Sequence, residues 1–267
     1  MKKIGLISGK GEFPIIFSKL VKELGFEIYA VAYIGMTHLD LEKYVSKISW
    51  MHIGEINKLI KFFKKEGVEN ITMVGKVHKK AIYSDIRPDL KALKLLAGLK
   101  DRSDTTILKA LTKEFEKNDF KVKAPSEYVQ SLLIGPGILT TRKPSKTELK
   151  DIEFGRKIAK ELADADIGHT VIVKDRAVLA LEAIEGTDEA IKRGGKLGGE
   201  GAVVLKSSRP NQDLRLDMPV IGPNTIEAMA EVKSSCLAFD ANMTLILEKD
   251  KVISIANANN IAIVSML

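Results

Sequence analysis

The chain has 267 residues, of which 45% are hydrophobic and 29% charged, and its formal net charge is +7. This composition excludes a disordered chain, and the length suits two domains. The single cysteine, Cys236, excludes an internal disulfide and a zinc site made of several cysteines. The positive charge favours anionic partners such as phosphorylated metabolites or lipid headgroups. Scarce aromatic residues and the lack of a nucleic-acid-binding motif argue against nucleic acid.

The first half of the chain alternates strand and helix patterns. Apolar runs predict strands over residues 3–8, 27–32 and 70–74. Helical spacing of apolar residues predicts helices over residues 14–24, 55–65, 89–99 and 104–118, and Asp89 and Asp104 are expected to cap the last two. This alternation predicts an α/β domain over residues 1–134, with a Rossmann-like, mostly parallel sheet and helices on both faces.

A change in composition marks the boundary between two domains. Gly-Pro-Gly at 135–137 and Arg-Lys-Pro at 142–144 predict a linker over residues 135–144. A second α/β domain is expected over residues 145–267, with a sheet order that cannot be deduced. Its predicted helices cover residues 145–162, 188–193 and 225–232, and its predicted strands cover residues 170–173, 178–182, 203–206, 237–239, 244–247 and 252–256.

The N-terminal segment and the lengths of the apolar runs indicate where in the cell the protein is expected. The basic start MKKIGLISGKG has an apolar stretch too short for a signal peptide, and no apolar run approaches the roughly 20 residues of a membrane span. We therefore expect a cytoplasmic protein.

A glycine loop follows the first predicted strand and opens the first helix. Gly9 and Gly11 flank Lys10, and free N–H groups at the start of a helix attract phosphate. The spacing is not that of a dinucleotide-binding loop, because Pro14 stands where the third glycine would be. A plain tight turn explains this loop as well as a phosphate site does.

The segment Glu182-Ala183-Ile184-Glu185-Gly186-Thr187-Asp188 holds three carboxylates around a glycine. Such an oxygen-rich turn suits a hard cation such as Mg²⁺, and Arg193 follows at a distance that allows it to clamp a phosphate. An ordinary capped turn between strand and helix is the alternative.

Residues 207–222 form the most unusual segment, in which Arg209, Asp213, Arg215 and Asp217 alternate in charge between two prolines. If the segment is extended, Asp213, Arg215 and Asp217 share one face. Carboxylates beside guanidinium groups suit metal-assisted phosphate chemistry, whereas a surface ion-pair loop would not require the prolines. The four histidines are not at metal-ligand spacing, and no site is assigned to them.

Taken together, these segments resemble the LpxI-type family of UDP-2,3-diacylglucosamine pyrophosphatases, which act in lipid A biosynthesis. The matching segments are GKGEFP at 9–14, GKV at 75–77, DIRPD at 85–89, DIGHTVIV at 166–173, EAIEGTD at 182–188 and RPNQDLRLDMPVIGPNTIE at 209–227. Two departures concern details of substrate contact. His169 stands where the family usually has glutamine, and residues 78–81 are more basic than the usual arginine-proline.

The resemblance implies two α/β domains with the lipid-bearing group bound between them. It implies hydrolysis of UDP-2,3-diacylglucosamine to UMP and 2,3-diacylglucosamine 1-phosphate, with attack at the phosphorus nearer the sugar and a divalent cation, Mg²⁺ or Mn²⁺. Asp217 matches the family's essential aspartate. The expected catalytic residues are Asp217, Asp213 and Arg215, and the expected metal ligands are Asp217, Asp213 and Asp188. The expected substrate-binding residues are Gly9, Lys10, Gly11, Glu185, Gly186, Thr187, Asp188, Arg193, Lys206 and Gln212.

The expected partners are the UDP-linked lipid, its lipid product and, transiently, the surface of the inner membrane. Nucleic acid is not expected, and a homo-oligomer is left open. The alternative function is a regulatory protein that binds a nucleotide sugar without hydrolysing it.

Overall fold

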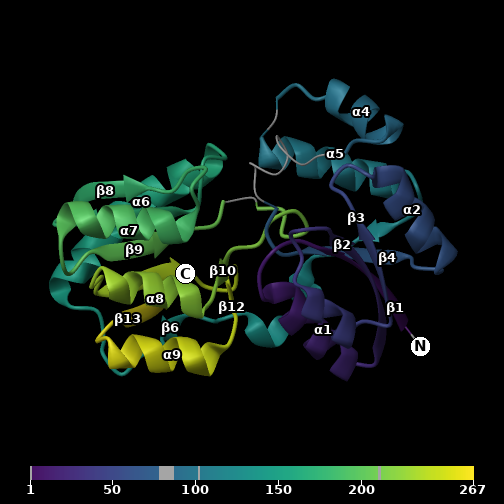
Figure 1. Cartoon of the computed structure of the whole chain (residues 1–267). Helices are drawn as coiled ribbons and strands as arrows, with labels where there is room; N and C mark the ends of the chain where they lie inside the picture. The colour runs from purple at the N-terminus through teal and green to yellow at the C-terminus, as the bar shows by residue number, and fades with distance from the viewer. Residues whose placement is uncertain (1, 78–86, 102, 210–211) are drawn as a thin grey trace. The chain divides into compact units, whose positions relative to one another are not determined.

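A computed structural model describes residues 2–77, 87–101, 103–209 and 212–267 (Figure 1). The chain forms two compact units, one of residues 1–130 and 214–216 and the other of residues 131–213 and 217–267. Both are α/β units, which confirms the predicted fold class. Part of the expected linker, β6 (Gly137–Ile138), pairs with a strand of the second unit. Within the described residues, no helix is both long and apolar enough to cross a membrane.

The sheet of the first unit is entirely parallel, as its alternating pattern predicts. Its strand order is β3-β2-β1-β4-β5, a Rossmann-like arrangement in which the order reverses at β1. The strands are β1 (Lys2–Ser8), β2 (Phe26–Tyr33), β3 (Lys47–Met51), β4 (Asn70–Val74) and β5 (Lys121–Val122).

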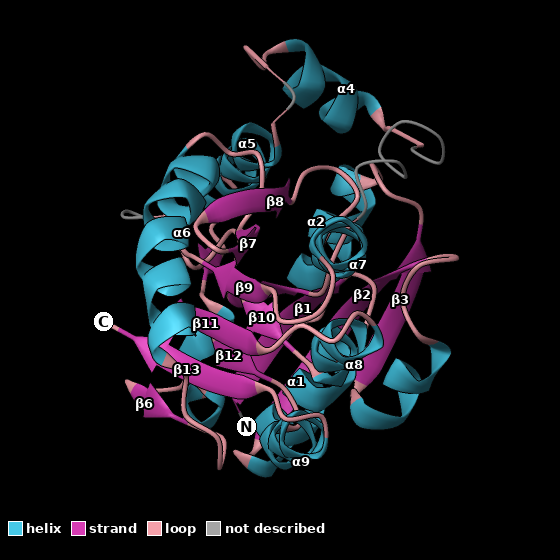
Figure 2. Cartoon of the chain, turned by 90° about the vertical axis from the view of Figure 1, so that its left-hand side faces the viewer, coloured by secondary structure: helices cyan, strands magenta, loops and turns pink. Residues whose placement is uncertain are grey.

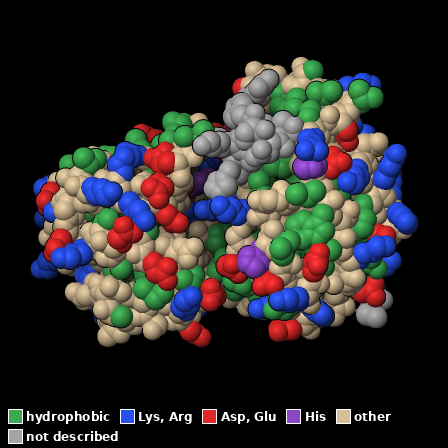
Figure 3. Space-filling view, in the orientation of Figure 1, with side chains coloured by type: hydrophobic (Ala, Val, Ile, Leu, Met, Phe, Trp, Pro, Cys, Tyr) green, Lys and Arg blue, Asp and Glu red, His purple; other side chains and the backbone are tan. Residues whose placement is uncertain are grey.

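Helices cover both faces of this sheet (Figure 1). The helices are α1 (Phe13–Glu23), α2 (Ile56–Lys65), α4 (Leu90–Ala97) and α5 (Asp104–Glu116), with short 3-10 turns at Leu39–Tyr44, Pro125–Glu127 and Gln130–Leu132. Phe63 of α2 and Phe115 of α5 are buried in one core. Asp89 caps α4 as predicted, but Ser103, not Asp104, caps α5, because the Ser103 hydroxyl accepts the backbone N–H of Thr106. Hydrophobic side chains remain exposed over α4 (Figure 3).

The second unit has a mixed sheet with the order β6-β13-β11-β9-β7-β8. Besides β6, its strands are β7 (Thr170–Lys174), β8 (Ala177–Leu181), β9 (Val203–Lys206), β11 (Cys236–Asp240) and β13 (Ala262–Met266). Strands β9, β11 and β13 are parallel, whereas β7 is antiparallel to both β9 and β8. The short strands β10 (Val220–Ile221) and β12 (Leu245–Ile246) form a separate parallel pair.

One long helix, α6 (Lys146–Asp164), packs on one face of this sheet, and three helices pack on the other (Figure 2). The three are α7 (Thr187–Gly198), α8 (Pro223–Glu231) and α9 (Lys249–Ala258). The predicted strand over residues 252–256 is wrong, because these residues lie in α9. Val252 and Ala256, four residues apart, are its buried positions, which is the spacing of a helix face.

Helix α7 lies unusually close to its neighbours because three of its residues are glycines. A Cβ atom at Gly194 would lie 2.7 Å from Ile172 of β7, one at Gly195 2.3 Å from Val232, and one at Gly198 2.2 Å from Leu179 of β8. Larger residues at these positions would push the helix away from the sheet and from the end of α8.

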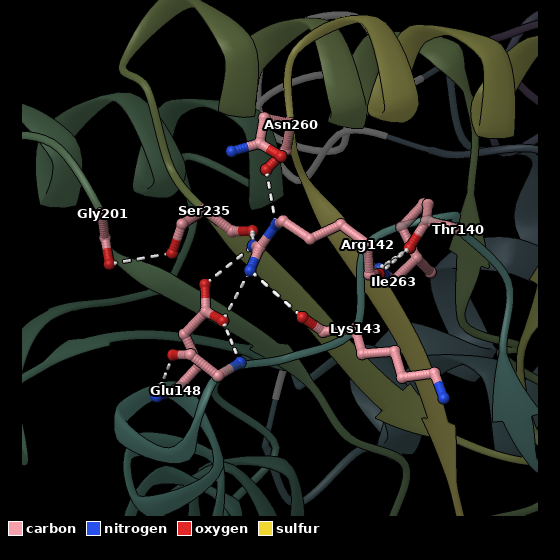
Figure 4. A network of polar contacts seen from close by, with 9 residues as sticks. Thr140, Arg142, Lys143, Glu148, Gly201, Ser235, Asn260 and Ile263 are labelled. Atoms are coloured by element: carbon pink, nitrogen blue, oxygen red, sulfur yellow. Dashed lines mark hydrogen bonds and ion pairs between the residues drawn. The ribbon is translucent and has the colours of Figure 1, made fainter.

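An ion pair between the partly exposed Arg142 and the buried Glu148 joins the start of the second unit to its interior (Figure 4). Arg142 donates two hydrogen bonds to the carboxylate of Glu148, at 2.9 and 2.8 Å, and others to the carbonyls of Asn260, Lys143 and Ser235. The Glu148 side chain is only 8% exposed. Desolvation raises the pKa of Glu148, but the hydrogen bonds from Arg142, Ser235 and Ser145 and the charge of Arg142 outweigh it and hold the pKa at about 2.

Candidate functional site

Polar residues from several strands lie at one edge of the sheet of the second unit. Glu182 follows the end of β8, Ser207 follows β9, and Asp240 ends β11. Because β7 runs in the opposite direction, His169 precedes its first residue at this same edge. Ligands of α/β proteins commonly bind outside the carboxyl ends of parallel strands. This edge is therefore the candidate site.

The register between β7 and β9 brings His169 to this edge. Thr170 pairs with Lys206, and the next backbone hydrogen bond runs from the N–H of Ser207 to the carbonyl of His169 at 2.8 Å. The imidazole Nδ1 lies 2.9 Å from the Ser207 carbonyl, and Nε2 lies 3.0 Å from Oδ2 of Asp217. A carbonyl only accepts hydrogen bonds, so Nδ1 carries a proton. His169 can therefore hold Asp217 by a charge-assisted hydrogen bond when Nε2 is protonated too.

Asp217 is both accessible and held in its charged form. Its side chain is 53% exposed. Partial removal from water raises the pKa of Asp217, but the hydrogen bond from His169 and the charges of His169, Lys206 and Arg209 outweigh this effect and hold the pKa below its ordinary value. Asp217 is thus an ionised carboxylate, which can bind a cation or orient a water molecule but is a weak proton acceptor at neutral pH.

A buried chain of polar groups lies behind this pair. Lys206 donates to the Thr187 hydroxyl at 3.0 Å, and that hydroxyl donates to Glu182 at 2.9 Å. The other oxygen of Glu182 accepts the backbone N–H of His169 at 3.2 Å. Desolvation raises the pKa of Glu182, but the charge of Lys206 and hydrogen bonds from Thr170, Thr187 and His169 outweigh this effect. The pKa of Glu182 is therefore below its ordinary value. Glu182 therefore links the turn formed by Glu185-Gly186-Thr187-Asp188, the EGTD turn, to His169.

The segment carrying Asp217 is a turn and is not extended, so the condition under which Asp213, Arg215 and Asp217 would share one face is not met. Residues 214–216 form the turn, and the N–H of Asp217 donates to the carbonyl of Asp213. The amide of Gln212 braces it by accepting from the N–H of Arg209 and donating to the Asp217 carbonyl, each at 2.9 Å. Gln212, expected to bind substrate, thus has a structural task. Its contact with substrate stays a prediction.

Arg215 belongs to the first unit together with Leu214 and Leu216, and it pairs with Glu116 of α5 at 3.0 Å. Asp213 and Asp217, two residues away on either side, belong to the second unit. The predicted catalytic roles of Asp213 and Arg215 are not tested by these contacts. Arg209 forms an ion pair with Asp166, and the adjacent residues 210–211 lie outside the described part of the chain.

The EGTD turn at Glu185 opens α7. Gly186 has a φ of +89°, which favours glycine, and among the described side chains none caps this helix. Arg193 donates to Glu185 at 2.6 Å, so it is engaged within the turn. Asp188 accepts a hydrogen bond from Thr225 of α8 at 3.4 Å. Their binding of substrate or metal stays a prediction.

The glycine loop lies in the first unit, where β1 ends. The N–H groups of Gly9 and Lys10 donate to the carbonyls of Val74 and Lys76, both at 2.8 Å. A Cβ atom at Gly9 would lie 2.6 Å from the Lys76 carbonyl oxygen. These contacts explain Gly9 as part of a tight loop and occupy two of the N–H groups that a phosphate would need. Gly11 has a φ of +101°, and the loop's role in phosphate binding stays a prediction.

The divalent cation expected from the family resemblance, with Asp217, Asp213 and Asp188 as its ligands, stays a prediction. Among the residues that the structure describes, no three histidine, cysteine, aspartate or glutamate side chains gather as a metal site. Mg²⁺ usually takes only one or two protein carboxylates and completes its shell with water and substrate phosphates. The ionised, half-exposed Asp217 fits such a site, and its hydrogen bond with His169 engages Oδ2.

Two models of domains from one family match this chain. The LpxI N-terminal domain matches residues 3–132, and the LpxI C-terminal domain matches residues 135–264. The chain belongs to the LpxI family. A protein of Caulobacter vibrioides named UDP-2,3-diacylglucosamine pyrophosphatase LpxI is 28% identical over 268 residues, which span 96% of this chain and 95% of the relative.

Solved structures outside the LpxI family show only remote likeness. An N5-carboxyaminoimidazole ribonucleotide synthetase in complex with ADP is 14% identical, with a TM-score of 0.28, over 64% of this chain and 32% of that chain. The synthetase from Thermotoga maritima is also 14% identical, with a TM-score of 0.26, over 68% of this chain and 41% of that one. The chain thus spans well under half the length of these synthetases.

Three residues of this site are absent from the set expected from the LpxI motifs. His169, Glu182 and Asp240 lie far apart in sequence, and only the sheet brings them to one edge. Asp240 accepts from the hydroxyl of Ser207 at 2.7 Å and from the N–H of Ser208 at 2.9 Å. The signal for His169 was its place in the DIGHTVIV segment directly before an apolar strand. No other histidine lies at metal-ligand spacing from His169, so the sequence offered no reason to assign it a role. Its partner is the carboxylate of Asp217.

Proposed function

We propose that this protein hydrolyses the pyrophosphate of UDP-2,3-diacylglucosamine to UMP and 2,3-diacylglucosamine 1-phosphate, a step of lipid A biosynthesis. Membership of the LpxI family over both units and the name of the Caulobacter relative support this activity. The observation that carries the proposal is the half-exposed carboxylate of Asp217, held ionised by His169 at the carboxyl edge of the sheet.

In the proposed mechanism, Asp217 orients the attacking water toward the phosphorus nearer the sugar. Its low pKa suits orientation and charge better than removal of a proton. The N–H groups of the first turn of α7, beside the buried ammonium of Lys206, favour phosphoryl oxygens. We propose that Asp217 and Asp213 hold Mg²⁺ or Mn²⁺ together with the substrate, and the ion would neutralise charge on the phosphates.

One assay tests the activity and its cation together. The purified protein is incubated with UDP-2,3-diacylglucosamine in detergent micelles, and UMP is measured by nucleotide chromatography. We expect release of UMP with Mg²⁺, its loss on chelation with EDTA, and its recovery with excess Mg²⁺ or Mn²⁺. Full activity after exhaustive chelation would contradict the cation. Saturable binding of the lipid without UMP would show a regulatory binding protein instead.

The contact between His169 and Asp217 leads to a separate prediction. We expect His169→Ala to lower kcat by about 10- to 100-fold with little change in KM, because Asp217 loses the group that fixes its orientation. His169→Gln should retain most of the activity, because the glutamine amide can donate a similar hydrogen bond. Steady-state release of UMP gives kcat and KM, and thermal melting checks the fold. Equal kcat in the alanine variant and the parent protein would contradict this role.

We also propose that the protein acts at the cytoplasmic surface of the inner membrane. The formal net charge of +7 and the two acyl chains of the proposed substrate support this location.

A further inference from the structure

Helix α4 carries apolar residues on a face that the described part of the first unit does not cover. Ala92 is buried and Leu95 packs against the core, whereas Leu90 is 78% exposed and Leu93 is 48% exposed. Residues three apart in a helix lie on the same face, so these two leucines form one outward apolar stripe. Single exposed leucines are common, whereas two on one face of a helix offer an apolar surface for a partner to cover.

The stripe lies on a firmly held helix. The carboxylate of Asp89 accepts the N–H groups of Lys91 and Ala92 at the start of α4, and also the N–H of Asn57 in α2 at 2.6 Å. The ammonium of Lys91 lies 2.5 Å from the carboxylate of Glu114 in α5. These contacts fasten α4 to both neighbouring helices, so the exposure of its leucines does not result from fraying.

Lysines line a groove that Leu90 of this stripe borders. This open groove beside α4 and α5 is lined by six of them, Lys91, Lys94, Lys100, Lys109, Lys113 and Lys117. The two carboxylates in the lining, Asp89 and Glu114, are already engaged by backbone N–H groups and by Lys91. The groove therefore has a net positive charge. Hydrophobic and basic side chains lie side by side over this part of the molecule (Figure 3).

We propose that the leucine stripe of α4 and the lysine groove beside it form a docking surface for an anionic membrane. Leu90 and Leu93 would enter the boundary between headgroups and acyl chains, while the lysines contact lipid phosphates and keep their alkyl stems along the apolar region. The inference rests on the proposed function in one respect, because a diacylated substrate resides in a membrane. Single-stranded nucleic acid fits this surface less well, because none of the described residues lining the groove is aromatic.

The test is co-sedimentation of the whole protein with lipid vesicles. We expect the protein to pellet with vesicles of phosphatidylcholine mixed with phosphatidylglycerol, to pellet weakly with phosphatidylcholine alone, and to dissociate as salt is raised. Leu90→Gln combined with Leu93→Gln should lower partitioning by at least about fivefold, because two apolar side chains no longer leave water. Lys94→Gln combined with Lys113→Gln should lower both the binding and its salt dependence.

Matched controls carry the same changes elsewhere. Leu24 and Leu197 are 60% and 69% exposed, so Leu24→Gln combined with Leu197→Gln should bind vesicles like the parent protein. Hydrolysis of a short-chain, water-soluble form of the UDP-lipid should be unchanged in both docking variants, whereas hydrolysis in vesicles should fall.

The outcomes separate docking from catalysis. Docking through α4 without any release of UMP would refute the proposed function but would still support the inference of a membrane-docking surface. The docking inference is overturned if the leucine variant pellets like the parent protein, if the parent protein does not pellet with anionic vesicles, or if it binds a DNA duplex instead of vesicles.

Discussion

Replacing Asp217 by asparagine is expected to lower kcat for release of UMP by about two to three orders of magnitude. Asparagine has the shape of aspartate and can still contact His169, but it lacks the negative charge that orients water and attracts a cation. The side chain is 53% exposed, so the change should leave the melting temperature nearly unaltered. Initial rates at saturating substrate, with melting curves measured in parallel, give both quantities.

A matched variant separates this effect from the loss of any surface carboxylate. Asp164 is exposed at the end of α6, and Asp164→Asn should have the kcat of the parent protein. An Asp217→Asn enzyme that keeps more than about a tenth of the parent kcat would remove Asp217 from the mechanism.

The sequence predicts the elements whose apolar residues run without interruption. The strands β1, β4 and β9 match their predicted ranges within one residue, because buried parallel strands contain few polar residues. β3 was missed, since Lys47 and Ser49 interrupt its apolar residues at the edge of the sheet. Residues 252–256 were assigned to the wrong structure because a short apolar run fits either a strand or a helix, and only packing decides between them.

The candidate site was predicted less completely than the fold. Asp217 and the EGTD turn are visible as motifs because their residues are adjacent in the chain. His169 is not, because its contact with Asp217 depends on the antiparallel register of β7 and β9. Strand order and register follow from contacts between distant segments, and local sequence patterns do not determine them. The bend at residues 214–216 could not be predicted either. It is stabilised by the side-chain amide of Gln212, whose hydrogen bonds with the backbone of Arg209 and Asp217 are not visible in the sequence.

Replacing Arg142 by methionine is expected to lower the free energy of unfolding of the second unit by about 3 to 5 kcal/mol. The change removes the partner of a buried carboxylate, Glu148, and takes away the Arg142 donor of the Asn260 carbonyl, whereas the Ser235 carbonyl keeps the N–H of Ala262. For a domain of this size, the melting temperature should fall by roughly 10 °C. Thermal and urea unfolding, followed by circular dichroism, measure the loss.

Two further variants test the reason for this loss. Arg142→Met combined with Glu148→Leu should be more stable than Arg142→Met alone, because the double change removes the unpaired charge as well. Lys192→Met breaks an ion pair with Glu231 that is partly exposed, and it should cost less than about 1 kcal/mol. If the double variant is no more stable than the single one, buried charge is not the cause.

The ion pair between Arg142 and Glu148 also makes the stability of the fold depend on pH. The folded pKa of Glu148, about 2, lies below the value of an unfolded glutamate, so its stabilisation is complete above the unfolded pKa. It is lost as the pH falls toward the folded pKa. The parent protein should therefore lose about 3 kcal/mol of stability through this group between pH 5 and pH 2. Arg142→Met should show a smaller loss over that range.

The three glycines that let α7 lie against the sheet also govern when the site can form. Each glycine lowers the intrinsic stability of an isolated helix by about 1 kcal/mol, so α7 depends on packing with Ile172, Leu179 and Val232 to exist at all. Val232, at the end of α8, is the last of these to leave the ribosome. A nascent chain that stops before Val232 carries the whole EGTD turn but lacks one of the three packing partners of α7, so we expect its helix, and the N–H groups at the helix start, to be less stable than in the finished protein.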